Sequence, residues 1–481
     1  MRFKTEPYAH QLECYNETKA RVAYGIFWEM GCGKSKITLD TAAWQYLNGN
    51  IDTLLVVAPK GVHRNWVTDE VPRHLSDDVE DHVSIWYQST KASQKRYQAK
   101  LEDALACKGL LIVAINYDAL ITKAGKAFCD RIMQRKVMVV LDESPRIKNP
   151  TAKRTKAALK LGTRAVSRRI LTGTPITNGP FDAYSQIDFL EPGFWASRHF
   201  GNYLSFKNYF GIFNTQSLSD GRRFNMCVGY QNIDNLYEML QSISDRKTKD
   251  TVLDLPPKVY NKIYVEMTKA QKAMYSQIRD HAIAFLDSGE MVTANLIIVE
   301  MLRLQQIING FVVAEQTQEI VDLDGGNPRL DALVEVLNDN DPQQAIVWAR
   351  FQHDIDLISD RLDEAGVTHA TYDGRTSDAN RAEAIDRFRS GDARVFVANP
   401  AAAGEGLTLT EATVVVYYSN TFKLAERLQS EDRAHRIGQD KTVLYIDLVC
   451  PDTIDERIVT ALRKKLEIAN VITGDNFKEW I

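Results

Sequence analysis

Short apolar runs alternate with amphipathic stretches along most of the chain. In the first half these runs have the length and the Val, Ile and Leu content of buried strands. They are TLLVVAP (53–59), GLLIVAINY (109–117), KVMVVLDE (136–143) and RRILTG (168–173). A helical stretch, KSKITLDTAAWQYL, follows the glycines at 31–33. Strands that alternate with helices predict an α/β domain whose parallel sheet is covered on both faces.

The same alternation resumes in the second half of the chain, with helical stretches such as DIDLISDRLDEAG between the apolar runs. The runs lie at residues 343–351, 368–374, 393–400, 412–419 and 442–449. This pattern predicts a second parallel-sheet lobe. The fold class expected is therefore α/β, with two parallel-sheet lobes.

The region between the two patterns differs in composition. Residues 180–245 are rich in Phe, Tyr and Asn, and LDLPPKVY (253–260) is an extended segment because Pro disfavours helix in the residue before it. A long helical stretch follows from about residue 268. We expect lobe one at 1–180, a helical insertion of lobe one at 181–250, a linker with a helical insertion of lobe two at 251–325, and lobe two at 326–481.

Composition narrows the class of protein. With 481 residues, 44% hydrophobic and 25% charged, the chain is typical of a soluble protein of two or three domains. No apolar run reaches the ~20 residues that span a bilayer, and the N-terminus lacks the apolar middle of a secretory signal. The six cysteines are scattered without a C-x-x-C pair, which argues against a zinc site or disulfide framework and suits a reducing compartment.

The net charge of −4 does not indicate a nucleic-acid partner, but the local charge pattern does. The stretch from Arg146 to Arg169 contains nine basic residues and no acid. Charge runs are often solvated helix faces, yet a stretch with one sign of charge favours contact with a polyanion.

The stretch WEMGCGKS (28–35) has the residues of a phosphate-binding loop. Gly31 and Gly33 let the backbone N–H groups curl toward phosphate oxygens, and the start of the next helix adds its positive end. Lys34 would neutralise the β- and γ-phosphates, and the Ser35 hydroxyl would bind Mg²⁺. Trp28 occupies the position where the general pattern has Gly, so a plain strand-to-helix turn is the alternative interpretation.

Two adjacent acids end the apolar run of VVLDES. Asp142 would hold Mg²⁺, and Glu143 would polarise the water that attacks the γ-phosphate. Paired acids at a strand end can also cap the next helix, but the upstream phosphate-binding loop favours the catalytic interpretation. The turn after the next strand, Thr172 to Thr174, carries hydroxyls that could sense the γ-phosphate.

The second lobe contains QSEDRAHRIGQ (429–439). Helical spacing would place Arg433 and Arg436 one turn apart on one face. Both could then act as arginine fingers on phosphates bound by lobe one, although an isolated pair at this spacing also fits a surface helix.

Taken in order, these motifs resemble the Swi/Snf-type ATPases of helicase superfamily two, over about residues 5–460. The motifs that carry the resemblance are PYAHQ (7–11), WEMGCGKS (28–35), VVAPKGVHRNWVTDE (56–70), INYDAL (115–120), LDESPRIKN (141–149), LTGTPITN (171–178), LPPK (255–258), TKAQKAMY (268–275), LRLQQI (302–307), IVWARF (346–351), YDGRT (372–376), AAAGEGLTLT (401–410) and QSEDRAHRIGQ (429–439). The resemblance implies RecA-like lobes with an ATP cleft between them, ATP and Mg²⁺ as cofactors, and double-stranded DNA as partner.

The resemblance also implies residue roles. Catalysis is expected from Lys34, Asp142, Glu143, Arg433 and Arg436, and metal binding from Ser35 and Asp142. Nucleotide binding is expected from Gln11, which resembles an adenine-reading glutamine, and from Gly31, Cys32, Gly33, Lys34, Ser35 and Gly406. DNA-backbone contacts are expected from Lys60, Asn65, Trp66, Asn116, Tyr117, Arg350, Asp373, Gly374 and Thr408, with Gly406 in one of the same motifs.

One position departs from the family pattern. Relatives commonly have Asp-Glu-Ala-His or Asp-Glu-Ser-His where this chain has Asp-Glu-Ser-Pro. Pro145 lacks an imidazole and a backbone donor, so coupling between ATP state and the other lobe could differ. Ser144 and the GLTL stretch at 406–409 favour the branch that contains annealing helicases, but two matches do not assign a branch.

The leading hypothesis is an ATP-dependent motor that moves along double-stranded DNA, as a monomer, through backbone contacts with little sequence specificity. The motifs leave two alternatives: a strand-separating helicase on RNA or single-stranded DNA, and a non-catalytic DNA-binding scaffold. No membrane role is expected, and protein partners stay unknown. A cytoplasmic setting in a bacterium or virus is favoured over a nuclear one.

Overall fold

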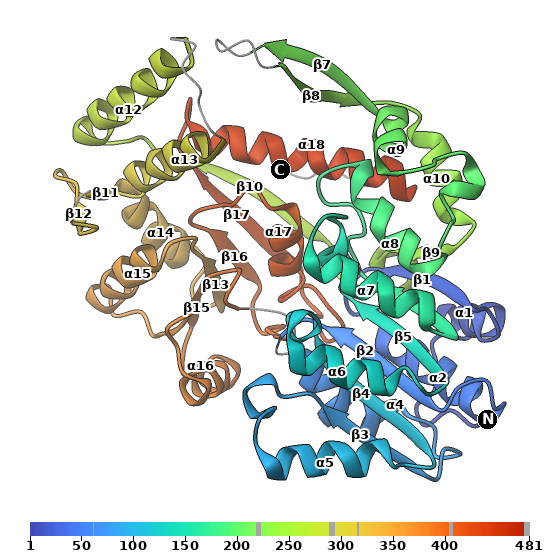
Figure 1. Ribbon diagram of the computed structural model, residues 1–481. Coiled ribbons are helices and arrows are strands. Elements are labelled where there is room, and N and C mark those ends of the chain that lie inside the picture. Colours follow the sequence, from blue (N-terminus) through green and yellow to red (C-terminus); the bar gives the residue numbers. More distant parts are fainter. Residues whose placement is uncertain (61, 218–222, 288–293, 315–316, 404–406, 476–481) are drawn as a thin grey trace. The chain divides into compact units, whose positions relative to one another are not determined.

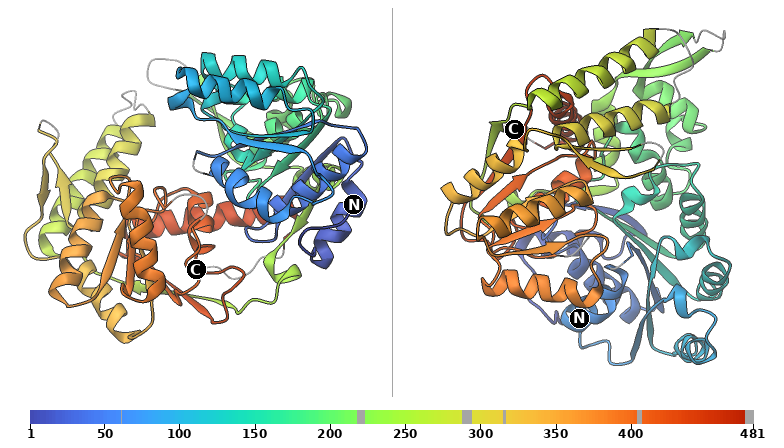
Figure 2. Two further views of the ribbon diagram at one scale, coloured as in Figure 1. Left: turned by 90° about the horizontal axis from the view of Figure 1, so that it is seen from below. Right: turned by 90° about the vertical axis from the view of Figure 1, so that its left-hand side faces the viewer.

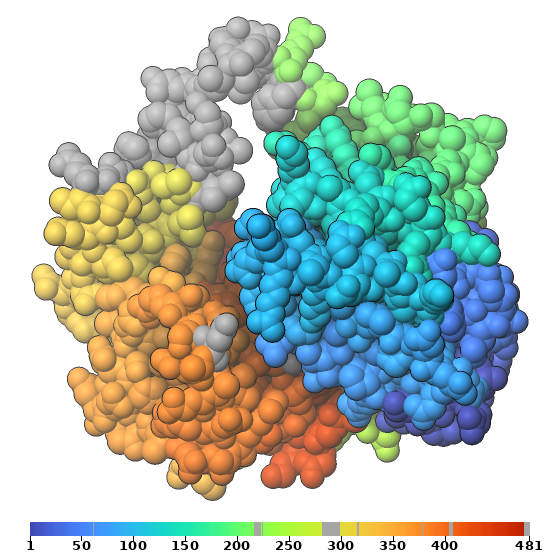
Figure 3. Space-filling view, turned by 60° about the horizontal axis from the view of Figure 1, so that its bottom comes forward, coloured from blue at the N-terminus to red at the C-terminus, as the bar shows by residue number. Residues whose placement is uncertain are grey.

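The structure, a computed structural model, describes residues 1–60, 62–217, 223–287, 294–314, 317–403 and 407–475. These residues form two compact units. Lobe one contains Met1–Ile212, Gly229–Asp254 and residues 468–475, and lobe two contains Phe213–Val228 and Leu255–Glu467. In the space-filling view, blue to cyan surface belongs to lobe one and orange surface to lobe two (Figure 3).

Lobe one is built on a sheet of seven parallel strands in the order β3-β4-β2-β5-β6-β1-β9 (Figure 1). The strands are β1 (Ala23–Trp28), β2 (Thr53–Ala58), β3 (His82–Trp86), β4 (Leu110–Asn116), β5 (Val137–Asp142), β6 (Ser167–Leu171) and β9 (Ser244–Lys247). Strands β2, β4, β5 and β6 confirm the four apolar runs. The edge strands β3 and β9 were not predicted from the sequence. Nearly all their residues are partly buried or exposed, so neither strand has a continuous apolar run.

Alternating side chains on the central strands point to opposite faces of the sheet and pack into two separate hydrophobic cores. Leu54 and Val56 pack with helices α1 and α2, whereas Leu55 and Val57 pack with α5 to α8 on the opposite face. Helices cover both faces of the sheet in Figures 1 and 2. They are α1 (Ala9–Thr18), α2 (Lys34–Leu47), α3 (Val62–Asn65), α4 (Val71–His74), α5 (Lys95–Leu105), α6 (Lys123–Ile132), α7 (Lys153–Arg164), α8 (Ala183–Leu190), α9 (Tyr203–Phe210), α10 (Ile233–Gln241) and α11 (Lys249–Val252). The prediction of a doubly covered parallel sheet is confirmed.

The segment 181–250, expected to be a helical insertion, is only partly helical. Besides α8 to α10 it contains the paired strands β7 (Gly211–Ser217) and β8 (Arg223–Tyr230), and its end forms β9 of the main sheet. The stretch from 211 to 230 mixes Phe, Tyr, Ile, Val and Thr with Gly and Asn, a composition that favours strands and turns over helix. The expectation of a helical insertion is therefore wrong for residues 211–217 and 223–230, which form strands.

Lobe two contains six parallel strands in the order β10-β17-β16-β13-β15-β14. They are β10 (Lys258–Tyr264), β13 (Ala345–Trp348), β14 (His369–Tyr372), β15 (Val395–Ala398), β16 (Val414–Tyr417) and β17 (Val443–Val449), and a small antiparallel pair is formed by β11 (Phe311–Val313) and β12 (Ile320–Asp322). The helices are α12 (Lys269–Asp287), α13 (Ala294–Ile308), α14 (Pro328–Asp339), α15 (Gln352–Glu364), α16 (Asp378–Ser390), α17 (Leu424–Glu431) and α18 (Ile454–Thr473). All five apolar runs of the second half are strands, which confirms the second lobe.

The end of α18 returns to lobe one. Ala469 and Ile472 are buried in the lobe-one core. Arg246, at β9, donates to both carboxylate oxygens of Asp475, at 2.8–3.1 Å, and also to the backbone oxygens of Phe27 and Gly173. The last residues of the described chain therefore complete the lobe that its first residues begin. No helix in the described ranges is both long and apolar enough to cross a bilayer.

The basic stretch between Arg146 and Arg169 does not form one exposed surface. Lys153, Lys156 and Lys160 are exposed along α7, but Arg169 is only 1% exposed. The Arg169 guanidinium donates to the backbone oxygens of Thr18 (2.8 Å) and Arg21 (2.9 Å). Its burial lowers its pKa to about 10, so it stays charged at neutral pH. Part of the predicted polyanion surface is thus an internal brace for backbone carbonyls.

We expect Arg169→Met to destabilise lobe one by about 2–4 kcal/mol, because it leaves buried carbonyl oxygens without their charged donor. Chemical denaturation followed by circular dichroism would measure the loss. Lys156→Met, on the exposed face of α7, is the matched control and should stay within about 0.5 kcal/mol of the parent. Equal stabilities for the two variants would contradict the bracing role.

Candidate functional site

The loop between β1 and α2 has the backbone of a phosphate-binding turn. Gly33 has a φ of +85°, and a Cβ atom there would lie 2.0 Å from the side-chain nitrogen of Gln11. That nitrogen donates to the Cys32 oxygen at 3.2 Å, and the Gln11 amide oxygen accepts from the Tyr8 backbone at 3.0 Å. Only glycine fits this position, so the predicted loop geometry requires Gly33.

Lys34 and Ser35 occupy the first turn of α2. The Lys34 ammonium donates to the backbone oxygens of Trp28 (2.8 Å) and Glu29 (3.2 Å), so it folds back over the loop. Trp28, which stands where the general pattern has Gly, is fully buried and donates its indole N–H to Asp245 at 2.7 Å. Trp28 is therefore the last core residue of β1, and the tight turn begins after it.

Asp142 is held from two directions at the end of β5. The Trp66 indole N–H donates to its carboxylate at 2.9 Å, and the Tyr117 hydroxyl donates to its backbone oxygen at 2.8 Å. Trp66 is 1% and Tyr117 is 2% exposed. These two residues were predicted to face DNA, but the structure places their side chains inside the lobe, where they orient a carboxylate.

The other lobe-one residues predicted to contact DNA differ in exposure. Lys60 is exposed and Asn65 is partly exposed. Asn116 is buried, and its amide oxygen accepts the backbone N–H of Ala119 at 2.9 Å, which fixes the turn after β4. DNA contact by these three residues stays a prediction, with Lys60 the best placed to reach a partner.

Glu143 follows Asp142 in a left-handed backbone conformation, with φ 52° and ψ 57°. The Thr172 hydroxyl donates to its carboxylate at 3.1 Å, which connects the loop after β5 to the loop after β6. Burial and the neighbouring Asp142 charge raise the pKa of Glu143, while the Lys34 charge opposes this shift. A carboxylate with a raised pKa is a better proton acceptor, which suits a base that activates water.

Ser144 makes a link that sequence reasoning missed. Its hydroxyl donates to the amide oxygen of Gln186 at 2.6 Å, and the Gln186 nitrogen donates to the Pro175 oxygen at 2.8 Å. All these groups are buried or half-buried, and Gln186 lies on α8, 42 residues along the chain. No local pattern marks a single glutamine on a helix as such a link. Pro145 is the second residue of a short 3₁₀ helix, Ser144–Ile147, and lies in its first turn, where a missing N–H is tolerated.

The arginines of lobe two are not presented as predicted. Helix α17 ends at Glu431, so Arg433 and Arg436 lie in the turns that follow it and not on one helix face. Beyond the helix, the Arg433 backbone oxygen accepts from the Leu409 N–H at 3.0 Å, which ties this segment to the chain around residue 409. Both guanidinium groups nevertheless donate to the Leu407 oxygen at 3.2 Å, so they still converge.

Arg350 and Thr408 have definite partners in lobe two. The Arg350 guanidinium donates to the side chain of Gln305, on α13, and its backbone N–H donates to the Ser419 hydroxyl at 2.8 Å. The Thr408 backbone oxygen accepts from Arg389 at 2.9 Å. Gly406, predicted to bind nucleotide, lies outside the described residues.

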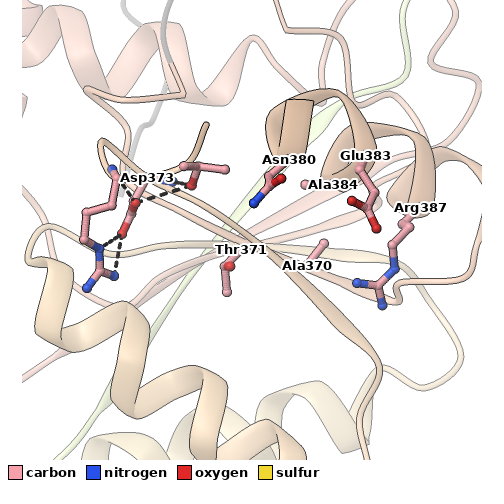
Figure 4. Close-up of a pocket in the computed structure, with 9 residues that line it drawn as sticks. Ala370, Thr371, Asp373, Asn380, Glu383, Ala384 and Arg387 are labelled. Carbon is pink, nitrogen blue, oxygen red and sulfur yellow. Dashed lines mark hydrogen bonds and ion pairs between the residues drawn. The ribbon is translucent and has the colours of Figure 1, made fainter. Parts of the chain in front are cut away.

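Asp373 and Arg375 border a hollow of about 330 Å³ beside β14 and α16 (Figure 4), and Gly374 lies between them in the chain. The Asp373 carboxylate accepts from the backbone and the side chain of Arg375, both at 2.7 Å. These hydrogen bonds and the Arg375 charge hold the pKa of Asp373 below its ordinary value even though burial opposes them. Asp373 therefore shapes the loop, whereas Gly374 and Arg375 are its exposed residues.

Oxygen donors suited to Mg²⁺ exist in lobe one. The Ser35 hydroxyl and the Asp142 carboxylate are hard ligands of the kind that Mg²⁺ takes together with phosphate and water. Among the described residues, no group of three or more His, Cys, Asp or Glu could hold a metal by itself. An ion that shares its ligands with a nucleotide needs fewer protein groups, so the residues present fit it.

The two parallel-sheet lobes and the phosphate-binding turn between β1 and α2 define a P-loop protein. Residues 13–312 match the SNF2-related domain and residues 328–438 match the helicase conserved C-terminal domain. The chain belongs to the SNF2-related family.

Two relatives illustrate the family. An uncharacterized ATP-dependent helicase of Mycoplasma pneumoniae is 27% identical over 463 residues, which cover 94% of this chain and 40% of the relative. The human SWI/SNF-related matrix-associated actin-dependent regulator of chromatin subfamily A member 1 is 28% identical over 461 residues, which cover 92% and 41%. The chain thus spans less than half the length of these relatives.

A solved structure, the Sulfolobus solfataricus SWI2/SNF2 ATPase core in complex with dsDNA, is similar at 22% identity, with a TM-score of 0.43. The similarity covers 98% of this chain and 94% of that one.

We expect Glu143→Gln to lower kcat at least ~100-fold, because an amide cannot accept the proton of the attacking water. In the parent, the raised pKa of Glu143 should place the acidic decline of kcat above the pH of an ordinary carboxyl. The same shift means that ionised Glu143 costs stability at neutral pH, so the melting temperature of Glu143→Gln should equal or exceed that of the parent. Glu80→Gln, at an exposed position, is the control, and a Glu143→Gln protein with parental kcat would contradict the assignment.

We expect Trp66→Phe to raise the half-saturating Mg²⁺ concentration of the ATPase about tenfold, because it removes the N–H that orients Asp142 while keeping an aromatic ring in the core. A Mg²⁺ titration of the hydrolysis rate would measure this. Trp86→Phe, at a partly buried position, serves as control. An unchanged Mg²⁺ dependence in the Trp66 variant would show that the indole is only a packing group.

Proposed function

We propose that the protein is an ATP-dependent motor that moves along double-stranded DNA. The observation that carries the proposal is the arrangement at the ends of β1, β5 and β6, where Lys34, Asp142 and Glu143 belong to one lobe and Thr172 contacts the base. Membership of the SNF2-related family supports the same activity. A scaffold that only bound DNA would not require a base held in this environment.

Within lobe one, the residues divide the work on the nucleotide. The N–H groups of the loop and the start of α2 would bind the β- and γ-phosphates, with the Lys34 ammonium turning from its own loop oxygens to the phosphate. Ser35 and Asp142 would hold Mg²⁺, which neutralises phosphate charge when bound. Glu143 would take the proton of the attacking water, and the Thr172 hydroxyl would keep its carboxylate oriented.

Lobe two would contribute Arg433 and Arg436 to the same nucleotide when the lobes close. Guanidinium groups stabilise the charge that spreads over the transferred phosphoryl group, an effect of about 10³–10⁵ in rate. Arg350, Gly374 and Thr408 together with Lys60, Asn65 and Asn116 would contact the DNA backbone, so that closing and opening shift one lobe along a strand. We propose that the motor works as a monomer in the cytoplasm and remodels DNA or protein–DNA complexes.

The ATPase rate should rise at least tenfold with duplex DNA, and more than with single-stranded DNA or RNA of equal length. Lys34→Ala should abolish the stimulated rate, and the stimulation should decline steeply with salt because the contacts are to phosphates. A steady-state ATPase assay across duplex, forked and single-stranded DNA and RNA would test this. Stimulation by single strands or RNA alone, with strand displacement, would favour the helicase alternative, and DNA binding without hydrolysis would favour the scaffold.

A further inference from the structure

The LPPK stretch, residues 255–258, begins the main segment of lobe two, Leu255–Glu467. Lys258 is also the first residue of β10, the edge strand that pairs with β17. The pairing opens with the Val443 N–H donating to the Pro257 oxygen at 3.4 Å. The stretch is therefore fixed to the sheet, and its side chains have defined positions.

This stretch contacts lobe two at two places within residues 431–436, which carry Arg433 and Arg436 and are called the arginine segment. The Lys258 ammonium donates to the Glu431 carboxylate at 3.0 Å, two residues before Arg433. The Pro256 backbone oxygen lies 2.7 Å from the Nε2 atom of His435, between the two arginines. Because a carbonyl oxygen only accepts, Nε2 must carry the hydrogen of this bond. Residues 256 and 258 therefore contact the arginine segment on both sides of Arg433, at His435 and at Glu431.

The first contact joins Lys258, whose side chain is 24% exposed, to a buried set formed by Arg427, Glu431 and Asp447. Arg427 donates to Glu431 at 2.9 Å and, through two nitrogens, to Asp447 at 2.6 and 2.9 Å. Glu431 and Asp447 have no exposed side-chain surface, and Arg427 has 2%. The Tyr260 hydroxyl adds a donor to Glu431 at 2.8 Å. Removing Lys258 would leave this set with an excess of buried negative charge, directly beside the segment that carries Arg433.

We infer that residues 255–258 form a clasp that positions Arg433 and Arg436 for phosphate, with Lys258 and His435 as positioning residues. The inference rests on the proposed function, since it gives the two arginines their role at the nucleotide. The Leu407 oxygen and the Leu409 N–H hold the arginine segment from the other side. A guanidinium that is misplaced by about 1 Å can lose about 100-fold in rate, so a clasp at this position has a measurable effect.

The test compares Lys258→Ala, Lys258→Arg and the matched control Lys262→Ala, on the same strand, in the full chain. We expect Lys258→Ala to lower the DNA-stimulated kcat 10–100-fold while the KM for ATP changes less than about threefold, since lobe one still binds the nucleotide. Lys258→Arg should restore most of the rate, because it keeps the charge beside Glu431. Lys262→Ala should match the parent in kcat and KM.

A double variant separates positioning from general damage. If Lys258 acts through Arg433, then Lys258→Ala should cost nothing further in an Arg433→Ala background. Should Lys258→Ala fail to fold, Tyr260→Phe, which removes one donor to Glu431 and keeps the ring, takes its place in the same comparison. The clasp would be overturned by either of two results. The first is that the kcat losses of Lys258→Ala and Arg433→Ala add in the double variant, and the second is that Lys258→Ala alone keeps the parental kcat. A parent without nucleic-acid-stimulated ATPase activity would instead overturn the proposed function.

Discussion

Two adjacent carboxylates stand at the tip of a strand that is otherwise sealed from water, and lobe one is organised around holding them. Two like charges at this position repel each other and lose solvation, so each needs its own support. The Asp142 carboxylate accepts from the Trp66 indole, and the Glu143 carboxylate accepts from the Thr172 hydroxyl. The Tyr117 hydroxyl donates to the Asp142 backbone oxygen and fixes the strand end that carries both acids. The raised pKa of Glu143 is the remaining cost of this arrangement, and it is also what makes the group a useful base.

Much of this could be predicted from the sequence, because it depends on local patterns. The central strands are continuous apolar runs. The loop around Gly33 has a recognisable pattern, in which glycines that allow a positive φ are followed by Lys34 and Ser35. The supports of the acids could not be predicted in the same way, since they depend on side chains brought together by the sheet. Trp66 and Tyr117 lie 76 and 25 residues from Asp142, and family motifs alone pointed them toward DNA. Arg169 was wrongly counted in the polyanion surface for a similar reason, because the sequence shows its charge but not its burial.

Lobe two shows the same division between a functional group and its support. Helical spacing placed Arg433 and Arg436 on one face, whereas the chain leaves the helix at Glu431 and brings them together on the Leu407 oxygen. Around this point the chain makes tertiary contacts that helical spacing does not reveal: the buried Arg427–Glu431 ion pair and the hydrogen bond from the Leu409 N–H to the Arg433 oxygen. Ser144 and Gln186 play a comparable part in lobe one, where they connect the loops after β5 and β6 beside Pro145.

The end of α18 packs in lobe one, and this limits where the gene can be truncated or recombined without loss of the fold. Residues 468–475 supply Ala469, Ile472 and Asp475, the partner of Arg246, so lobe one is discontinuous in sequence. A gene fragment that stops after Asp254 would encode an unfinished core in which Arg246 has lost the Asp475 carboxylate. Domain shuffling or truncation at the lobe boundary is therefore disfavoured, and the two lobes are expected to evolve as one inseparable piece.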